Sequence, residues 1–245
     1  MSAFEQRQQQ LLQQLNDLIC DSKPTVTPTK TVTTGWRQLD AMLPASGWRQ
    51  GQLVEWLGDV KGSGVSLLGL WSAWQMAQSG GAFVVVDSSG RFFPPAAAAL
   101  GIRLSRMMVV SPQNKADFQW TLDQILRCPA VGAVWVNVPA VNSRTFRRWQ
   151  LAVEESDSFG VLVRERKYLR EPSWAHLRLS AVPLAGQGDW RFRVQLERAA
   201  RGSAGGSCEL DFNEILETSG RGFFQTPSIA DRDWSQNTSP QLNKK

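Results

Sequence analysis

The sequence predicts an α/β protein with a doubly wound, mostly parallel central sheet flanked by helices, and with antiparallel strands at the C-terminal edge. Two observations lead to this prediction. Between residues 52 and 165, short apolar segments alternate with segments of helical spacing, which is typical of parallel βαβ units. After about Trp174, apolar and polar residues alternate between turn residues, as they do in antiparallel strands that bury one face.

The predicted strands of the parallel part are short and almost wholly apolar, which indicates burial on both faces of the sheet. They span residues 52–58 (QLVEWLG), 82–87 (AFVVVD), 106–112 (RMMVVSP), 132–138 (GAVWVNV) and 159–165 (FGVLVRE). The three antiparallel strands are expected at residues 174–184 (WAHLRLSAVPL), 189–200 (DWRFRVQLERAA) and 207–212 (SCELDF).

The helices between the parallel strands show apolar residues three and four positions apart. They are expected at residues 66–81 (SLLGLWSAWQMAQSGG), 94–102 (PPAAAALGI), 116–128 (ADFQWTLDQILRC) and 143–156 (SRTFRRWQLAVEES). Two glycines end the first segment, two prolines open the second, and Ser143 is the expected N-cap of the fourth.

The segments outside this pattern define the expected domain organisation. Residues 1–22 form a glutamine-rich helix with an apolar stripe, and residues 23–33 form a linker rich in threonine and proline. Residues 34–225 form the core domain. Residues 226–245 are polar and are expected to be disordered.

Composition excludes several classes of protein. The single histidine, His176, leaves no basis for most metal-site and triad chemistries, and its strand-like surroundings favour a structural role. Three scattered cysteines fit reduced cytoplasmic thiols. No apolar run is long enough to span a bilayer, and the N-terminus lacks a secretory signal. We therefore expect no metal site, no membrane partner, and a cytoplasmic, nucleoid-associated location. The tryptophans fall mostly in apolar segments and are expected to fill the core.

The stretch GDVKGSGVSL at residues 58–67 is similar to a phosphate-binding loop between a strand and a helix. The strict pattern, G-x-x-x-x-G-K-[ST], has one residue fewer between its glycines and a lysine where this chain has Val65. Because valine cannot neutralise phosphate charge, the stretch is either a degenerate nucleotide site or a plain glycine-rich turn between a strand and a helix. Its candidate residues are Gly58, Lys61, Gly62, Ser63, Gly64, Val65 and Ser66.

A longer stretch, residues 34–67, resembles the opening of RecA-type recombinases, and the resemblance extends to about Phe212. The matching residues of the opening are Thr34, Gly35, Leu39, Asp40, Gly47, Gly51, Glu55, Gly58 and Gly64. The resemblance implies a RecA-like fold, with a water-activating carboxylate near Asp87 and the magnesium-supporting position at Asn137. Asp87 is shorter than the usual glutamate and Asn137 is neutral, so both are vestigial catalytic candidates. ATP with Mg²⁺ would therefore bind weakly if at all.

Within this superfamily, the chain resembles ImuA-like proteins, which are RecA-related and SulA-like, in residues 92–113, 147–165 and 171–184. The resemblance implies an accessory role in damage-induced translesion DNA synthesis in the SOS response. The implied partners are a polymerase-like protein of the ImuB type, an error-prone polymerase and RecA. Two alternatives stay open: a slow DNA-stimulated ATPase that uses Ser66, Asp87 and Lys61, and a SulA-like inhibitor of a filament-forming division protein.

Basic residues form the second candidate site. Arg144, Arg147 and Arg148 share one helix face, because they are three and four positions apart. For any one of these residues a solvated helix face is the better explanation, whereas the cluster as a whole also suits contact with a DNA backbone. The full set of DNA-binding candidates is Arg144, Arg147, Arg148, Arg164, Arg166, Lys167, Arg170, Arg198 and Arg201.

The apolar stripe of the N-terminal helix is a candidate protein interface. Phe4, Leu11, Leu15 and Leu18 lie on that stripe at helical spacing. The stripe would serve self-association, bind a partner, or pack on its own domain.

Overall fold

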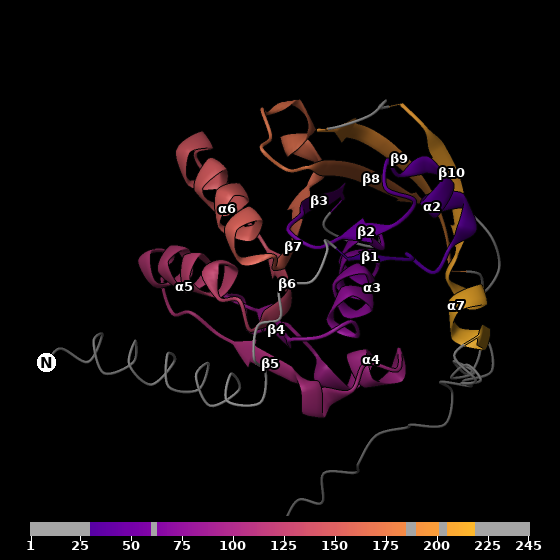
Figure 1. Ribbon diagram of the computed structural model, residues 1–245. Coiled ribbons are helices and arrows are strands. Elements are labelled where there is room, and N and C mark those ends of the chain that lie inside the picture. The colour runs from indigo at the N-terminus through magenta and orange to yellow at the C-terminus, as the bar shows by residue number, and fades with distance from the viewer. Residues whose placement is uncertain (1–29, 60–62, 185–189, 201–204, 219–245) are drawn as a thin grey trace, which may run out of the picture.

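The computed structural model describes residues 30–59, 63–184, 190–200 and 205–218. An eight-stranded sheet with the order β10-β9-β8-β3-β7-β6-β4-β5 forms its centre (Figure 1). The strands are β3 (Leu53–Gly58), β4 (Ala82–Val86), β5 (Met107–Val110), β6 (Val131–Asn137), β7 (Phe159–Glu165), β8 (Leu177–Pro183), β9 (Arg191–Ala199) and β10 (Ser207–Asp211).

Helices cover both faces of this sheet. They are α2 (Arg37–Met42), α3 (Val65–Ala77), α4 (Pro94–Ala99), α5 (Lys115–Arg127), α6 (Ser143–Ser156) and α7 (Phe212–Thr218), with the short 3₁₀ helices η1 (Leu104–Arg106) and η2 (Arg166–Arg170). Figure 1 shows α5 and α6 on one side of the strands, and α3 and α4 on the other. This arrangement confirms the predicted α/β fold with a mostly parallel sheet.

Alternation along the strands divides the core into two clusters. On β6, Ala133 and Trp135 pack with α3 and α4, whereas Val134 and Val136 pack with α5 and α6. Successive side chains of a strand point to opposite faces, so a continuous apolar run supplies both clusters.

The tryptophans mostly fill this core, as predicted. Seven of them are buried: Trp36, Trp48, Trp56, Trp71, Trp74, Trp135 and Trp149. Trp174 and Trp190 are exposed instead.

Three details differ from the sequence-based expectations. β8 pairs in parallel with β3 and is antiparallel only to β9, so the change of strand direction falls one strand later than predicted. Thr31 and Val32, which we assigned to the linker, form β1, which pairs with β2 (Trp48–Arg49). Asn142, and not Ser143, is the N-cap of α6, because the Asn142 side chain accepts a hydrogen bond from the Thr145 N–H.

Other predictions lie outside the described residues. These are the N-terminal helix with Phe4, Leu11, Leu15 and Leu18, and the polar tail at 226–245. Within the described ranges, no helix is long and apolar enough to cross a membrane.

Candidate functional site

A cavity of about 650 Å³ opens at the carboxyl ends of β3, β4, β6 and β7. This edge is where ligands bind in open α/β sheets. The cavity collects the vestigial site that the sequence predicts: Gly58, Val65, Ser66, Asp87 and Asn137 all line it. Much of the remaining lining is apolar: Leu67, Leu70, Phe92, Phe93, Ala96, Ala97, Leu100, Trp135, Val138, Pro139 and Val163.

Val65 is the first residue of α3 and occupies the position where a phosphate loop has its lysine. Its side chain is buried in the α3 core cluster. Val65 Cγ1 lies 2.5 Å from where a Cβ on Gly58 would be, so only glycine fits beneath it. The end of β3 and the start of α3 are therefore joined by an apolar contact. Ser66, the next residue, is exposed at the cavity wall.

Gly64 precedes α3 in the left-handed conformation, with φ +73°. A Cβ on Gly64 would lie 2.1 Å from Cε1 of Phe192 on β9. The Phe192 ring thus packs directly on the loop backbone. Ser63 is buried, and its hydroxyl donates to the Asp59 carbonyl. The described part of the loop is held by protein contacts.

Asp87 follows β4, and its carboxylate organises the loop after that strand. Oδ1 accepts hydrogen bonds from the Ser89 N–H (3.0 Å) and hydroxyl (2.7 Å), and Oδ2 accepts one from the Phe92 N–H (2.7 Å). Burial alone would raise the pKa of Asp87, but the bonds from Phe92 and Ser89 outweigh it, so the pKa is lowered. A carboxylate held this way is ionised, but both of its oxygens already accept hydrogen bonds from Ser89 and Phe92.

The described residues do not suit a magnesium nucleotide well. Asn137 is neutral, and the Asp87 carboxylate accepts hydrogen bonds from the backbone of the loop that follows it. The cations of the lining are Arg91, which is exposed, and Arg164, which is buried in an ion pair. Among the described residues, no group of three or more histidine, cysteine, aspartate or glutamate side chains could hold a metal ion. Lys61 and Gly62 lie outside the described ranges.

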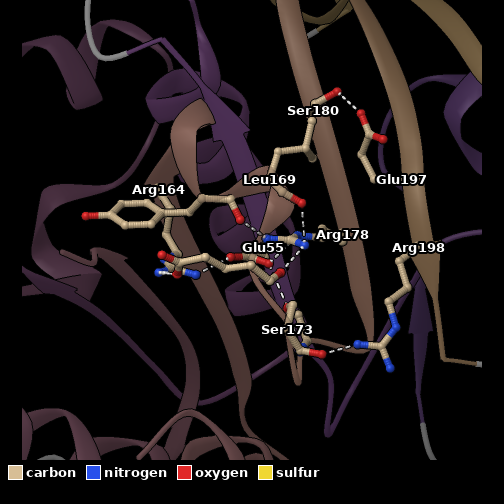
Figure 2. Close-up of polar contacts among 11 residues, drawn as sticks. Glu55, Arg164, Leu169, Ser173, Arg178, Ser180, Glu197 and Arg198 are labelled. Atoms are coloured by element: carbon tan, nitrogen blue, oxygen red, sulfur yellow. Dashed lines mark hydrogen bonds and ion pairs between the residues drawn. The ribbon is translucent and has the colours of Figure 1, made fainter. Parts of the chain in front are cut away.

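Next to the cavity, Glu55 on β3 forms a buried ionic network with two arginines (Figure 2). Glu55 is fully buried, with Arg164 Nη1 2.8 Å from Oε1 and Arg178 Nε 2.8 Å from Oε2. The Ser173 hydroxyl donates to Oε2 over 2.7 Å. Because a buried carboxylate needs such compensation, the network ties β3, β7 and β8 together.

The same network fixes η2 at the carboxyl edge. Arg178 Nη1 donates to the carbonyls of Leu169 (3.0 Å) and Glu171 (2.8 Å). The guanidinium of Arg164 lies 4.2 Å from the Tyr168 ring centroid. Arg164 is only 3% exposed. The prediction that Arg164 contacts DNA is therefore wrong, because its charge is buried and paired inside the protein.

The other basic candidates lie at the surface around η2 and α6. Arg144, Arg148, Arg166, Lys167, Arg170 and Arg198 are exposed, and Arg147 is half-buried. Some are engaged within the protein: Arg148 pairs with Asp123 at 2.8 Å, and Lys167 pairs with Glu165 at 2.6 Å. The Lys167 pKa is raised by the hydrogen bond to Glu165.

Arg147 and Arg198 both reach the loop that joins η2 to β8. The Arg147 guanidinium lies 4.9 Å from the Trp174 ring centroid. Arg198 donates to the Ser173 carbonyl. The structure thus brings Arg147 of α6 and Arg198 of β9, which are far apart in sequence, to the same loop. Arg201 lies outside the described ranges.

His176 has the structural role that its surroundings suggested. Its Nδ1 accepts a hydrogen bond from the Leu53 N–H (2.9 Å), and its Nε2 lies 2.8 Å from Glu154 Oε1. An Nδ1 that accepts carries no proton, so the tautomer places the hydrogen on Nε2. The ring links β3, α6 and β8.

Sequence reasoning missed two groups of residues. Glu55 matched the RecA-type opening, but its ionic network with Arg164 and Arg178 gave no signal, because charged residues in an apolar strand show neither their burial nor their partners. Trp174 was grouped with the core tryptophans, although the run of charges before it was a usable signal of a surface loop.

Comparisons with known proteins agree with the fold and the resemblance. Protein ImuA of Caulobacter vibrioides is 28% identical over 209 residues, which cover 74% of this chain and 84% of that protein. RecA of Crocosphaera subtropica is 30% identical over 108 residues, and RecA of Acinetobacter baumannii is 27% identical over 113 residues. These two matches cover 44% and 46% of this chain, and 30% and 32% of the respective RecA proteins.

A solved structure shows the same fold. The crystal structure of the RadB recombinase superposes with a TM-score of 0.60 at 17% identity, covering 75% of this chain and 97% of that chain. No family model matches the sequence. The fold and the relatives agree with the predicted resemblance: the chain is similar to RecA-like proteins of the ImuA type.

Proposed function

We propose that this protein is a RecA-fold accessory factor of DNA repair that does not hydrolyse ATP efficiently. It acts as an adaptor in damage-induced translesion synthesis, in the cytoplasm, through contacts with a polymerase-like partner of the ImuB type, an error-prone polymerase and DNA. The similarity to ImuA over most of both chains supports this role.

One observation supports the loss of hydrolysis above the others: Val65 is buried against Gly58 at the start of α3. Phosphoryl transfer needs a cation that neutralises the β- and γ-phosphates. Valine supplies an apolar contact there instead. The occupied carboxylate of Asp87 and the neutral Asn137 point the same way.

Nucleotide binding and turnover test this proposal directly. Binding of fluorescent ATP and ADP is measured with and without magnesium, together with phosphate release in the presence of single-stranded DNA. We expect release at the background rate for the wild type and for Ser66→Ala alike. Ser88→Ala is the matched control, because Ser88 also lines the cavity and is exposed. Turnover that Ser66→Ala abolishes and Ser88→Ala preserves would establish the ATPase alternative.

The adaptor role has a separate test. The purified chain is mixed with the ImuB-type protein encoded by the same genome, and the mass of the mixture is measured by light scattering after size exclusion. We expect a complex that forms without added nucleotide. Separate elution at micromolar concentrations of both proteins contradicts the adaptor role.

DNA contact is favoured by the basic residues around η2 and α6. Arg144, Arg166 and Arg170 are exposed and have no ion-pair partner among the described residues. Cations of this kind bind phosphates and release counterions, which makes binding sensitive to salt. The division-inhibitor alternative requires no such surface.

A further inference from the structure

The cavity at the carboxyl edge of the sheet continues onto the surface through an exposed phenylalanine. Phe93 lines the cavity and is 65% exposed, more than any other large apolar side chain of the described residues. Ala96 of α4 is exposed at the same lining. A single exposed ring is ordinary on a protein surface, but a ring at the rim of an apolar cavity is typical of an interaction site.

The loop that carries Phe93 is held on both sides of it. The Phe92 N–H donates to the Asp87 carboxylate over 2.7 Å, and the centroid of the Phe92 ring lies 5.9 Å from that of Trp135 in the cavity wall. Pro94 follows as the first residue of α4, and its ring fixes φ. Because this backbone is already ordered, a ligand that packs on Phe93 loses little conformational entropy.

The interior of the cavity is apolar where a phosphate-binding site would carry charge. Val65 takes the place of the lysine, and the buried side chains of Leu70, Ala97 and Val163 continue the wall. The volume of about 650 Å³ lies within the range of roughly 300–1,000 Å³ that is usual for ligand pockets. The described lining therefore suits a large apolar group.

The charges of the lining disfavour a triphosphate and suit a cation at the mouth. Asp59, which is exposed, and the ionised Asp87 have no ion-pair partner among the described residues. Glu165 is paired with Lys167, and Arg91 is the exposed cation of the described lining. The excess of carboxylates repels phosphates and attracts a lysine or an arginine.

We propose that this cavity is a protein-docking site. It receives a large apolar side chain of a partner protein, with a lysine or arginine of the same segment beside Asp59, while Phe93 packs on the partner's surface. This inference rests on the adaptor role within the proposed function. A small molecule enclosed in the cavity would leave Phe93 in water, whereas a polypeptide that extends past the rim covers it. Apolar anchors in a pocket with a polar rim are the usual centre of protein interfaces.

Two substitutions at exposed positions test the cavity and its rim. Phe93→Ala removes the ring at the rim, and Ala96→Trp places a bulky ring at the cavity lining. The affinity of each variant for the labelled ImuB-type protein of the same genome is measured by fluorescence anisotropy. We expect each variant to weaken the complex by about tenfold or more, as the loss of a central anchor does.

Leu151→Ala is the control for these variants, because Leu151 is 44% exposed but lies on α6, outside the cavity lining. It should leave the affinity unchanged. Urea unfolding of each variant checks that the fold is intact. If Ala96→Trp lowers the stability of the fold, Phe93→Ala decides the outcome.

A matched pair of acidic variants tests the expected cation of the partner. We expect Asp59→Asn to weaken the complex by about two- to fivefold, because an exposed ion pair is lost. Glu155→Gln removes the same unit of charge on α6, where the Glu155 side chain is 75% exposed, and should leave the affinity unchanged. Equal effects of the two variants would mean that only the net charge matters, and would overturn the contact of Asp59 with the partner.

The outcomes separate this inference from the proposed function. A wild-type chain that forms no complex with the ImuB-type protein contradicts the adaptor role, and the docking site with it. A wild-type chain that forms the complex, with the affinity unchanged in Phe93→Ala, keeps the adaptor role and overturns the docking site alone. Loss of self-association in Phe93→Ala at unchanged partner affinity would assign this surface to a second copy of the chain, and would overturn the proposal too.

Discussion

At the scale of single residues, charged groups inside the sheet hold the candidate site in place. Glu55 has no exposed surface and contacts Arg164, Arg178 and Ser173. A buried ion pair contributes little net stability compared with apolar residues, but removal of one partner leaves an uncompensated charge. Glu55 is therefore the buried counter-charge for the guanidinium groups of both Arg164 and Arg178.

Substitution of Glu55 tests this dependence. We expect Glu55→Gln to lower the free energy of unfolding by about 3–5 kcal/mol, because two buried guanidinium groups lose their counter-charge. Glu171→Gln is the matched control: Glu171 pairs with the same Arg164 at 3.4 Å, but its side chain is 49% exposed. Its cost should stay below about 1 kcal/mol. Urea unfolding measures both, and similar costs would argue against the buried network.

Asp87 is the second residue whose charge matters for the fold. Its lowered pKa means that the ionised form is stabilised in the folded protein. That stability is fully present above the ordinary pKa of 3.8 and is lost as the pH falls through the lower folded value. We expect Asp87→Asn to cost about 1.5–3 kcal/mol at neutral pH, through weaker hydrogen bonds from Ser89 and Phe92.

The pH dependence distinguishes this charge effect from a packing effect. The difference in unfolding free energy between the wild type and Asp87→Asn should shrink as the pH falls below about 4. Urea unfolding at a series of pH values measures it. A difference that stays constant down to the lowest pH at which the protein is folded would rule out the charge as its source.

At the scale of elements, local sequence predicted the parallel strands and helices well. The predicted strand at 159–165 and helix at 143–156 coincide with β7 and α6, because continuous apolar runs and helical spacing are local properties. Pairing direction is not local. β8 alternates in sequence like an antiparallel strand, yet it pairs in parallel with β3, since it lies between β3 and an antiparallel neighbour.

The candidate site was predictable only in part, for a related reason. The positions of Val65, Asp87 and Asn137 at one edge followed from parallel strands whose carboxyl ends meet. Their packing did not: neither the contact of Val65 with Gly58 nor that of Gly64 with Phe192 is visible in the sequence. Arg164 was misassigned to the surface because its partner, Glu55, is 109 residues away.

The junction between the loop and α3 gives a prediction at this scale. We expect Gly64→Ala to lower the free energy of unfolding by at least about 1–3 kcal/mol. The positive φ of this residue strains any side chain, and the added Cβ would also overlap the Phe192 ring. Gly90→Ala is the control, since Gly90 has φ +65° but nothing lies within 4 Å of its Cβ position. Gly90→Ala therefore reports the backbone strain alone.

The same measurement shows whether Phe192 causes the additional cost. We expect Gly64→Ala to lower the free energy of unfolding less in a Phe192→Leu background than in the wild type, because the smaller side chain can move away from the added Cβ. Thermal or urea unfolding of the four proteins measures the difference. Equal costs for Gly64→Ala and Gly90→Ala would mean that the ring does not constrain the loop.

At the scale of the whole molecule, charge is distributed unevenly. The formal net charge is +5, and exposed arginines gather around α6 and η2, whereas Arg191 and Arg193 on β9 are paired with Glu209. A net positive charge attracts DNA from any direction, but a contact with phosphates depends on where the cations lie. The two effects can be separated by substitutions that change the net charge equally.

Salt dependence of DNA binding makes that separation. We expect Arg144→Gln to weaken binding of oligo(dT) and to reduce the slope of log affinity against log salt by about 0.7, the value for one phosphate contact on a single strand. Arg191→Gln is the control. It removes the same unit of charge at the first residue of β9, where Arg191 is paired with Glu209, and should leave the slope unchanged. If both variants change affinity and slope equally, the arginines act through net charge, and the surface around α6 and η2 is not a binding site. A change confined to Arg144→Gln would place a DNA contact at the N-terminal end of α6, the helix to which Arg144 belongs.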